Sequence, residues 1–194
     1  RRCDDIVLEN GKTLPMLRQQ DGKRISMSDY VIDESTGRLS PLGMFAISVR
    51  RRVSHPVDCS CPSCSGEYES MMERSVRVTL AEAASLYLDS RITQMIDRAD
   101  IRISKPAAGY ASCPDHTLKG DILDMLIDSE KLGISLTESY AMIPDASICG
   151  FIVMHPEAGY PEIRQVSKEQ LNDYAGRRGM SEEKARQFLS NLLA

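Results

Sequence analysis

The sequence predicts an α+β fold, a single domain in which a twisted antiparallel sheet is flanked by long helices. Short apolar runs bounded by turn residues are separated by longer segments in which apolar residues recur with the period of an α-helix. The longest such segment, residues 67–97, contains no Gly or Pro. The chain shows no regular strand-helix-strand alternation, which opposes a parallel sheet. It also lacks a GxGxxG or Walker loop, so neither a dinucleotide site nor a nucleoside triphosphate site is indicated.

The first element is expected to be a hairpin. Residues 6–8 and 14–17 are short apolar runs, and Asn10-Gly11 between them suits a type I′ turn with two positive φ angles. Pro15 weakens the second strand or places it at an edge. After a Pro-Leu-Gly turn, the partly alternating run "LGMFAISVR" predicts a further strand.

Two helices are predicted in the middle of the chain, over residues 67–97 and 117–133. Gly133 stands where a C′ glycine is expected, and Asp115 or Thr117 is a candidate cap for the second start. The apolar stripe of the first helix is expected to face the core rather than a cofactor. Its members are Tyr68, Met71, Met72, Val76, Leu80, Ala83, Ala84, Tyr87 and Leu88.

The last third is expected to complete the sheet and add two helices. The segment "LTESYAMIPDASICGFIVMHP" holds two strand-like runs split at Pro144, and "YPEIRQVS" is expected to continue the sheet after a turn at Gly159. Ser167 has capping-box spacing for a helix that stops at Gly179, and Ser181 begins the final helix.

Composition narrows the class of protein. The 194 residues are 42% hydrophobic, which suits one domain over residues 1–194 with a real core. A net charge of −4 disfavours nucleic acid, and the run from Arg50 to Arg52 is isolated. No apolar run approaches the ~20 residues that span a bilayer, and no signal-peptide pattern is present. Six cysteines without a dense framework indicate a reducing, cytoplasmic location.

The stretch "KPAAGYASCPDHT", residues 105–117, is the first candidate site. Pro106 restrains the backbone, Gly109 permits a close approach, and Lys105 and Tyr110 supply a cation and a ring. Such a loop ahead of a helix can hold a small anionic or zwitterionic ligand. The alternative is a rigid connection with Tyr110 in the core.

These residues carry a resemblance to a known family. The stretch resembles the Arg-Pro-Ala-Pro-Gly-Tyr-Pro-Ala-Cys-Pro-Asp-His signature of the reactivation domain of cobalamin-dependent methionine synthase. "LTESYAMIPDASICGFIVMHP" and "QLNDYAGRRGMS" are similar to two further runs of that domain, and "LRQQ" and "SDYV" also have counterparts. The resemblance covers nearly the whole chain and is strongest from Lys105 onward.

The resemblance implies a role in methionine biosynthesis. In that family the domain binds S-adenosylmethionine and supports reductive methylation of cob(II)alamin, so that the synthase regains methylcobalamin. Cobalamin is carried by a partner domain or subunit, and a flavodoxin-type reductant supplies the electron. The site needs little acid–base chemistry because the cofactor carries the reaction. His116 and His155 are therefore interpreted as structural.

Site residues follow from the resemblance position by position. Lys105 stands where the family has an Arg that meets the methionyl carboxylate, and Ala107 stands where its backbone meets the adenine. Tyr160 corresponds to the tyrosine that follows His-Pro and contacts the ligand. The binding residues implied in this way are Lys105, Ala107, Gly109, Tyr110, Tyr160 and Pro161.

The resemblance also has departures. Lys105 keeps the charge of Arg but lacks its bidentate fork. The family's upstream segment, which supplies an acidic ligand contact, is expected to be absent, so the chain could be a compact or free-standing relative. The alternative function is a non-catalytic module of the same fold that docks on a corrinoid protein without binding S-adenosylmethionine.

A cysteine-rich loop at residues 54–66 is expected to be an insertion that the family signature does not explain. His55, Cys59, Cys61 and Cys64 have ligand types and spacing for zinc, or for an iron–sulfur cluster with a fourth donor. The alternative is a loop of free thiols.

Overall fold

The computed structural model describes residues 3–50, 67–96 and 98–193. The chain divides into two compact units. The first unit comprises Arg1–Phe45, Arg98–Met125 and Cys149–Ala194, and the second comprises Ala46–Asp97 and Leu126–Ile148. All six ligand-binding residues implied by the sequence belong to the first unit. A single domain over residues 1–194 stays a prediction.

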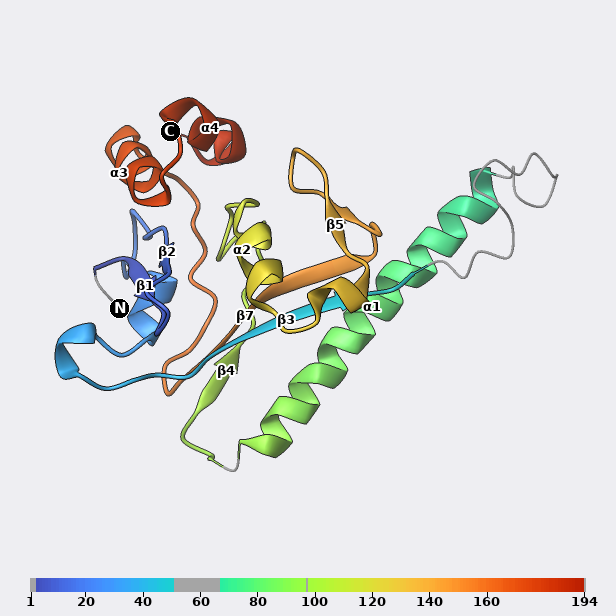
Figure 1. The fold of residues 1–194 in the computed structure, drawn as a ribbon, viewed down its shortest axis with the longest axis horizontal. Helices are drawn as coiled ribbons and strands as arrows, with labels where there is room; N and C mark the ends of the chain where they lie inside the picture. The colour runs from blue at the N-terminus through green and yellow to red at the C-terminus, as the bar shows by residue number, and fades with distance from the viewer. Residues whose placement is uncertain (1–2, 51–66, 97, 194) are drawn as a thin grey trace. The chain divides into compact units, whose positions relative to one another are not determined.

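The stretch with the family signature, residues 105–117, follows the edge of a three-stranded sheet; we call it the signature loop. The order of the sheet is β3 (Leu42–Ser48), β7 (Ser147–His155) and β4 (Arg102–Ser104), so β7 is the central strand; the three strands are labelled in Figure 1. β4 runs antiparallel to β7, with Ile103 opposite Met154. Five consecutive residues of β7 are buried, as expected of a central strand. The antiparallel pairing and the mixture of helices and strands confirm the predicted α+β class.

The N-terminal hairpin forms, but with a different turn. β1 (Asp5–Val7) pairs antiparallel with β2 (Thr13–Pro15). Gly11 has a φ of 81°, whereas Asn10 does not adopt a positive φ. Asn10 instead accepts a hydrogen bond from the Lys12 N–H through its side chain at 2.9 Å. The type I′ prediction is therefore wrong, because it requires a positive φ at both residues; Asn10 instead stabilises the turn through its side chain.

The two C-terminal helices begin where their caps predict. Ser167 accepts from the Gln170 N–H ahead of α3 (Lys168–Arg178), and Ser181 caps α4 (Glu182–Phe188). Gly179 ends α3 with a φ of 65°. The two helices pack over a core cluster made of Leu17, Ile163, Val166, Leu171, Tyr174, Ala175, Ala185 and Leu189.

The segment before α3 was expected to continue the sheet, and that prediction is wrong. It forms no strand; instead the Ile163 N–H donates to the Ala111 carbonyl at 2.8 Å, and Val166 bridges to Leu193. Pro161 has no N–H to give to a ladder. Ile163 and Val166 are buried. The alternating apolar residues of this segment therefore pack into the core one at a time, without forming a strand.

α2 (Leu118–Met125) is shorter than its predicted helix. Asp128, with a φ of 59°, interrupts the helical run before the short 3-10 helix η3 (Ser129–Leu132). Gly133 then ends η3 in the left-handed region, at the position that the sequence predicts for a helix stop. The periodicity thus indicated one helix where two shorter ones form.

The second unit contains the long helix α1 (Glu67–Met95) and the small hairpin of β5 (Ser135–Leu136) and β6 (Met142–Ile143). Arg77 lies on the packed side of α1 and pairs with Asp145 at 2.7 Å.

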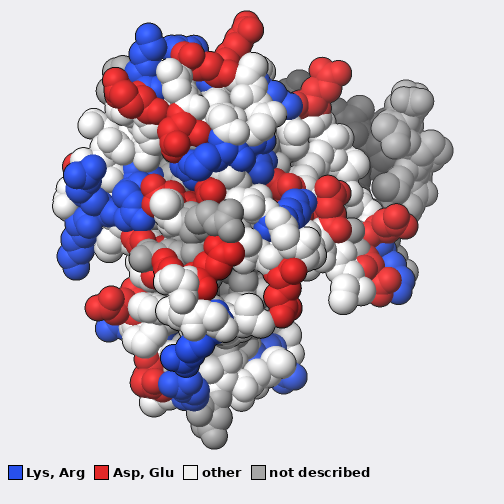
Figure 2. All heavy atoms as spheres, turned by 60° about the vertical axis from the view of Figure 1, so that its left-hand side comes forward, with Lys and Arg blue, Asp and Glu red and all other residues white. Residues whose placement is uncertain are grey.

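None of the described helices is long and apolar enough to cross a bilayer. Figure 2 shows acidic and basic side chains interspersed over the face that it presents.

The expectation that the apolar stripe of α1 faces the core is wrong. Tyr68 is 73% exposed and Tyr87 is 67% exposed, and Met71, Met72, Val76 and Leu80 are also exposed. The packed side instead carries Ala81 and the stem of Arg77, whose charged end reaches a carboxylate. Both sides of this helix carry apolar residues, so periodicity alone did not identify the packed side.

Candidate functional site

The signature loop begins by running close against β7. The Phe151 N–H donates to the Pro106 carbonyl at 3.0 Å, and the Ala108 N–H donates to the Cys149 carbonyl at 3.0 Å. Between these two bonds lies Gly150, where an added Cβ would be 2.3 Å from the Pro106 oxygen. Only glycine allows the two backbones to approach this closely.

The loop then turns outward at its tip. Gly109 has a φ of 93°, and its N–H donates to the Cys113 carbonyl at 2.7 Å. An added Cβ at Gly109 would be 2.7 Å from the His116 ring, so this ring closes the inner side of the turn. Tyr110 is 63% exposed. The tip therefore presents the Tyr110 ring to solvent, and the alternative that placed this ring in the core is wrong.

Asp115 fixes the far end of the loop to α3. It is 2% exposed and accepts from both the N–H and the hydroxyl of Thr117, at 2.8 and 2.7 Å. Its carboxylate also accepts from the Tyr174 hydroxyl at 2.7 Å and lies 3.4 Å from the Arg178 guanidinium. Burial and the Asp115 carboxylate raise the pKa of Tyr174, which keeps its proton. The Cys-Pro-Asp-His and Asp-Tyr-Ala motifs thus meet in one buried cluster.

The polar groups beneath the loop are largely buried. His116 Nδ1 lies 2.9 Å from the Lys119 ammonium, and burial lowers the pKa of both groups. Burial also raises the pKa of Cys113 to about 12 and of Cys149 to about 11, so both are protonated thiols rather than nucleophiles. This arrangement supports the structural interpretation of His116.

Lys105 meets Tyr160 through its main chain. The Lys105 N–H donates to the Tyr160 hydroxyl oxygen at 2.9 Å, which joins two segments 55 residues apart. The Lys105 side chain is turned inward: the residue is 8% exposed, and its ammonium lies 5.2 Å from the centroid of the Phe45 ring. Tyr160 itself is 60% exposed. The structure therefore brings the two predicted residues together without offering the Lys105 ammonium to solvent.

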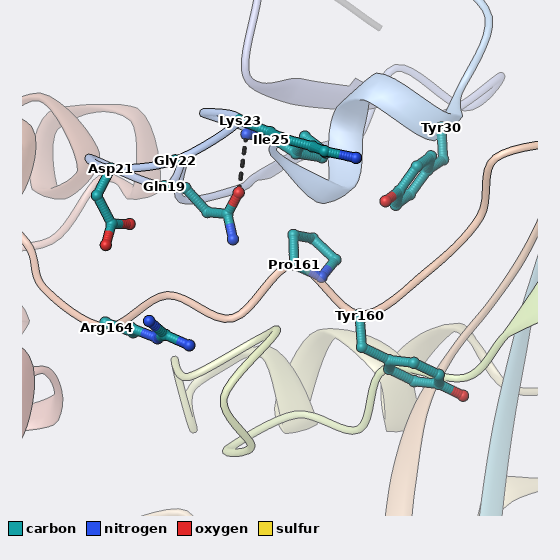
Figure 3. Close-up of a pocket in the computed structure, with 9 residues that line it drawn as sticks. All are labelled: Gln19, Asp21, Gly22, Lys23, Ile25, Tyr30, Tyr160, Pro161 and Arg164. Atoms are coloured by element: carbon teal, nitrogen blue, oxygen red, sulfur yellow. Dashed lines mark hydrogen bonds between the residues drawn. The ribbon is translucent and has the colours of Figure 1, made fainter.

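A pocket of about 300 Å³ adjoins Tyr160 (Figure 3). It is lined by Gln19, Asp21, Gly22, Lys23, Ile25, Tyr30, Tyr160, Pro161 and Arg164. We call it the Tyr160 pocket. Of the predicted binding residues, only Tyr160 and Pro161 line it. The Ile25 N–H donates to the Gln19 side-chain oxygen at 3.1 Å and closes one wall, while the Lys23 ammonium points toward Tyr30.

Sequence reasoning did not single out Gln19, Lys23 or Tyr30 as site residues. Gln19 and Tyr30 belong to "LRQQ" and "SDYV", the two short runs with family counterparts. That resemblance was the one signal that pointed to them. Lys23 lies in a turn between these runs and had no signal of its own.

A second pocket of about 560 Å³ shares Lys23, Ile25 and Tyr30 with the first. We call it the His155 pocket; its other lining residues are Asp29, Arg102, His155, Pro156 and Glu157. His155 Nδ1 accepts from the Glu157 N–H at 3.1 Å, which leaves Nε2 as the protonated nitrogen of the ring. The His155 and Tyr30 rings lie 5.7 Å apart between centroids.

The predicted metal ligands, His55, Cys59, Cys61 and Cys64, lie outside the described residues. Within the part of the chain that is described, no group of three or more His, Cys, Asp or Glu side chains is placed to hold a metal ion.

Comparison with known proteins agrees with this architecture. Residues 2–179 match the family described as "Vitamin B12 dependent methionine synthase, activation domain". The chain belongs to this family. A solved structure described as the MetH reactivation domain bound to AdoHcy superposes on this activation domain with a TM-score of 0.80 and 27% sequence identity. The match covers all of this chain and 67% of the other.

These matches confirm the family resemblance and the fold that it implies. The loop that carries the family signature lies between β4 and α2, and Tyr160 lies in the segment that follows β7. In this activation domain the two are held together by the bond between Lys105 and Tyr160.

Proposed function

We propose that the chain binds S-adenosylmethionine where the signature loop meets Tyr160 and Pro161, and that it supports reductive methylation of cobalamin. The observation that carries the proposal is the hydrogen bond from the Lys105 N–H to the Tyr160 hydroxyl. It joins the two segments that the family resemblance assigns to the ligand, beside a pocket of about 300 Å³. The similar MetH structure holds AdoHcy, the demethylated form of S-adenosylmethionine.

The main task of the protein in this reaction is to position the methyl group of the ligand near cobalt. In the proposed reaction one electron reduces cob(II)alamin and the sulfonium methyl passes to cobalt, which leaves AdoHcy. We propose that the cobalamin belongs to a partner domain or subunit of methionine synthase, and that the electron comes from a flavodoxin-type donor. This chain's residues would hold the nucleoside and exclude water, which lowers the entropic cost of the transfer. The buried thiols and the paired His116 and Lys119 are consistent with a site that performs no proton transfer.

Individual roles follow from the geometry. Tyr160 accepts a bond from the loop, so its own O–H can donate to an acceptor on the ligand while its exposed ring offers a face. The main chain at Ala107 and Gly109 is proposed to meet the adenine, with the exposed Tyr110 ring beside it. Pro161 forms a rigid wall of the Tyr160 pocket.

One observation favours the alternative, a non-catalytic module that docks on a corrinoid protein. The resemblance assigns the methionyl carboxylate to Lys105, yet the Lys105 ammonium lies inside, against the Phe45 ring. If no other cation replaces it, affinity for S-adenosylmethionine falls and the fold keeps only its docking role.

Calorimetric titration with S-adenosylmethionine and AdoHcy distinguishes the two functions. We expect measurable binding, weakened about tenfold by Tyr160→Ala because both the ring contact and the bond to the loop are lost. Tyr87→Ala, which removes an exposed ring on α1, is the matched control and should bind as the parent chain does. No heat of binding at millimolar ligand would favour the docking module.

We also propose a location and a metal site. The free thiols of Cys113 and Cys149 support a reducing, cytoplasmic location. Zinc binding by His55, Cys59, Cys61 and Cys64 is tested by metal analysis of protein purified without added zinc. A zinc content far below one ion per chain would contradict the zinc site.

A further inference from the structure

The side of α1 that faces away from its packed residues carries an apolar surface. Nine of the fourteen exposed large apolar side chains in the described residues belong to this one helix. A helix of a soluble protein normally turns its apolar face inward, and a contiguous exposed apolar patch marks an interaction surface. We therefore expect this side of α1 to be covered by a partner.

Seven residues form a row along the middle of this side. At about 100° per residue, its central member, Thr79, lies about 160° from both Arg77 and Ala81, which mark the packed side. All seven residues are exposed and none is charged. We call them the outer row: Tyr68, Met72, Ser75, Thr79, Ala83, Leu86 and Ser90.

The spacing of the outer row is symmetric about Thr79. Its steps are 4, 3, 4, 4, 3 and 4 residues, which read the same from either end. A second copy of α1 that runs antiparallel across a two-fold axis at Thr79 therefore brings the two rows into register. Met72 then lies against Leu86 of the partner subunit, apolar against apolar. The ring of Tyr68 lies against Ser90 of the partner subunit, large against small, which allows close packing.

The hydroxyl groups at the centre of the outer row already have partners within the helix. The Ser75 hydroxyl donates to the Met71 carbonyl at 2.9 Å, and the Thr79 hydroxyl donates to the Ser75 carbonyl at 3.0 Å. A polar group costs little to bury when it is already hydrogen-bonded. The centre of the row can therefore lose its contact with water, as a seam between two helices requires.

The apolar area is sufficient for a stable dimer. Six large apolar side chains lie on the outer row or beside it, with exposed fractions between 49% and 73%. At roughly 100 Å² each they would bury about 600 Å² per copy, which reaches the lower end of the ~600–1,000 Å² per partner of specific interfaces. They are Tyr68, Met71, Met72, Val76, Leu86 and Tyr87.

We propose that the outer row is the interface of a homodimer, in which α1 of a second copy of this chain lies antiparallel across a two-fold axis at Thr79. A second copy is the occupant because the row is complementary to itself. The inference does not depend on the proposed function. The row belongs to the second compact unit, whereas the six predicted ligand-binding residues belong to the first.

Sedimentation velocity of the full chain at increasing concentration measures the dimer. We expect a dissociation constant in the micromolar range or below, as interfaces of this size give. Leu86→Glu should raise it at least about 100-fold, because each copy would place an unpaired carboxylate in the seam. Ile127→Glu is the matched control: Ile127 is 93% exposed in the same unit but outside α1, so the dissociation constant should not change.

Cysteine cross-linking tests the register independently. In Thr79→Cys the two introduced thiols meet at the axis, so a mild oxidant should join the two copies. Ser90→Cys is the control, since its thiols would lie about 33 Å apart along the helix axis; the native cysteines are common to both variants. A chain that stays monomeric at near-millimolar concentration overturns the inference and leaves the outer row to a different protein. A dimer that Leu86→Glu does not weaken, or that cross-links equally in both cysteine variants, also overturns it.

Discussion

Replacing Asp115 by Asn tests whether the buried cluster below the signature loop holds the site together. The substitution keeps the shape of the side chain but removes its charge and one acceptor. Asp115 receives three hydrogen bonds, from the N–H and hydroxyl of Thr117 and from the Tyr174 hydroxyl. An Asn amide that keeps its oxygen toward Tyr174 must turn its NH₂ toward the Thr117 N–H, so two donors face each other.

The cost can be estimated from these contacts. A buried donor left without an acceptor costs about 1–3 kcal/mol, and loss of the charge beside Arg178 adds about 1 kcal/mol. We therefore expect a loss of about 3 kcal/mol in the free energy of unfolding. For a chain of this length that corresponds to a fall of about 6–12 °C in Tm. Because the cluster anchors the loop to α3, the affinity for AdoHcy should fall as well.

Thermal and urea unfolding followed by circular dichroism measure this loss. Asp173→Asn is the matched control. The Asp173 side chain lies on α3, is 62% exposed and pairs with Arg177 at 2.8 Å. We expect it to cost at most about 0.5 kcal/mol. A Tm for Asp115→Asn within about 1 °C of the parent chain would refute the reasoning, because it would mean that the buried acceptor contributes nothing.

Two further predictions concern backbone space and pH. Gly150→Ala should cost more than about 3 kcal/mol or prevent folding, because its Cβ would be 2.3 Å from the Pro106 oxygen. Gly176→Ala, inside α3 with nothing within 4 Å, should instead add about 0.5–1 kcal/mol. Thermal unfolding of both variants tests this prediction. Equal Tm values for the two variants would contradict the close backbone contact at Gly150. The free energy of unfolding should fall as pH rises above the unfolded thiol pKa of 9.0, because the folded pKa is about 12 for Cys113 and about 11 for Cys149. The unfolded chain then releases protons first, with a slope of about 1.4 kcal/mol per pH unit for each thiol. Urea titrations of the reduced protein from about pH 8 to 11 test this, and Cys149→Ala should reduce the slope; an unchanged stability over that range would exclude it.

Local signals in the sequence located several elements correctly. Ser167 and Ser181 cap their helices through bonds within one turn, and Gly179 ends α3 by its own backbone conformation. The boundaries of such elements depend on neighbours in the sequence, which is why the sequence predicts them. The family motifs likewise predicted that the signature loop and Tyr160 lie together, and the Lys105 N–H does bond to the Tyr160 hydroxyl. That the two form a binding site stays a prediction.

The remaining features depend on contacts between distant segments. The Lys105 ammonium lies against the ring of Phe45, a residue 60 positions earlier, and no local pattern in the sequence predicts this contact. The pocket walls combine a turn near Lys23 with the segment after β7. The exposed stripe of α1 had the period of a core helix, yet burial depends on which side other segments cover.

A crystal structure of the chain with AdoHcy tests the central claim most directly. We expect the nucleoside where the signature loop meets Tyr160 and Pro161, with the Tyr160 hydroxyl at hydrogen-bond distance, about 3 Å, from an acceptor on the ligand. AdoHcy bound away from Tyr160, or absent from crystals grown at saturating ligand, would contradict the claim.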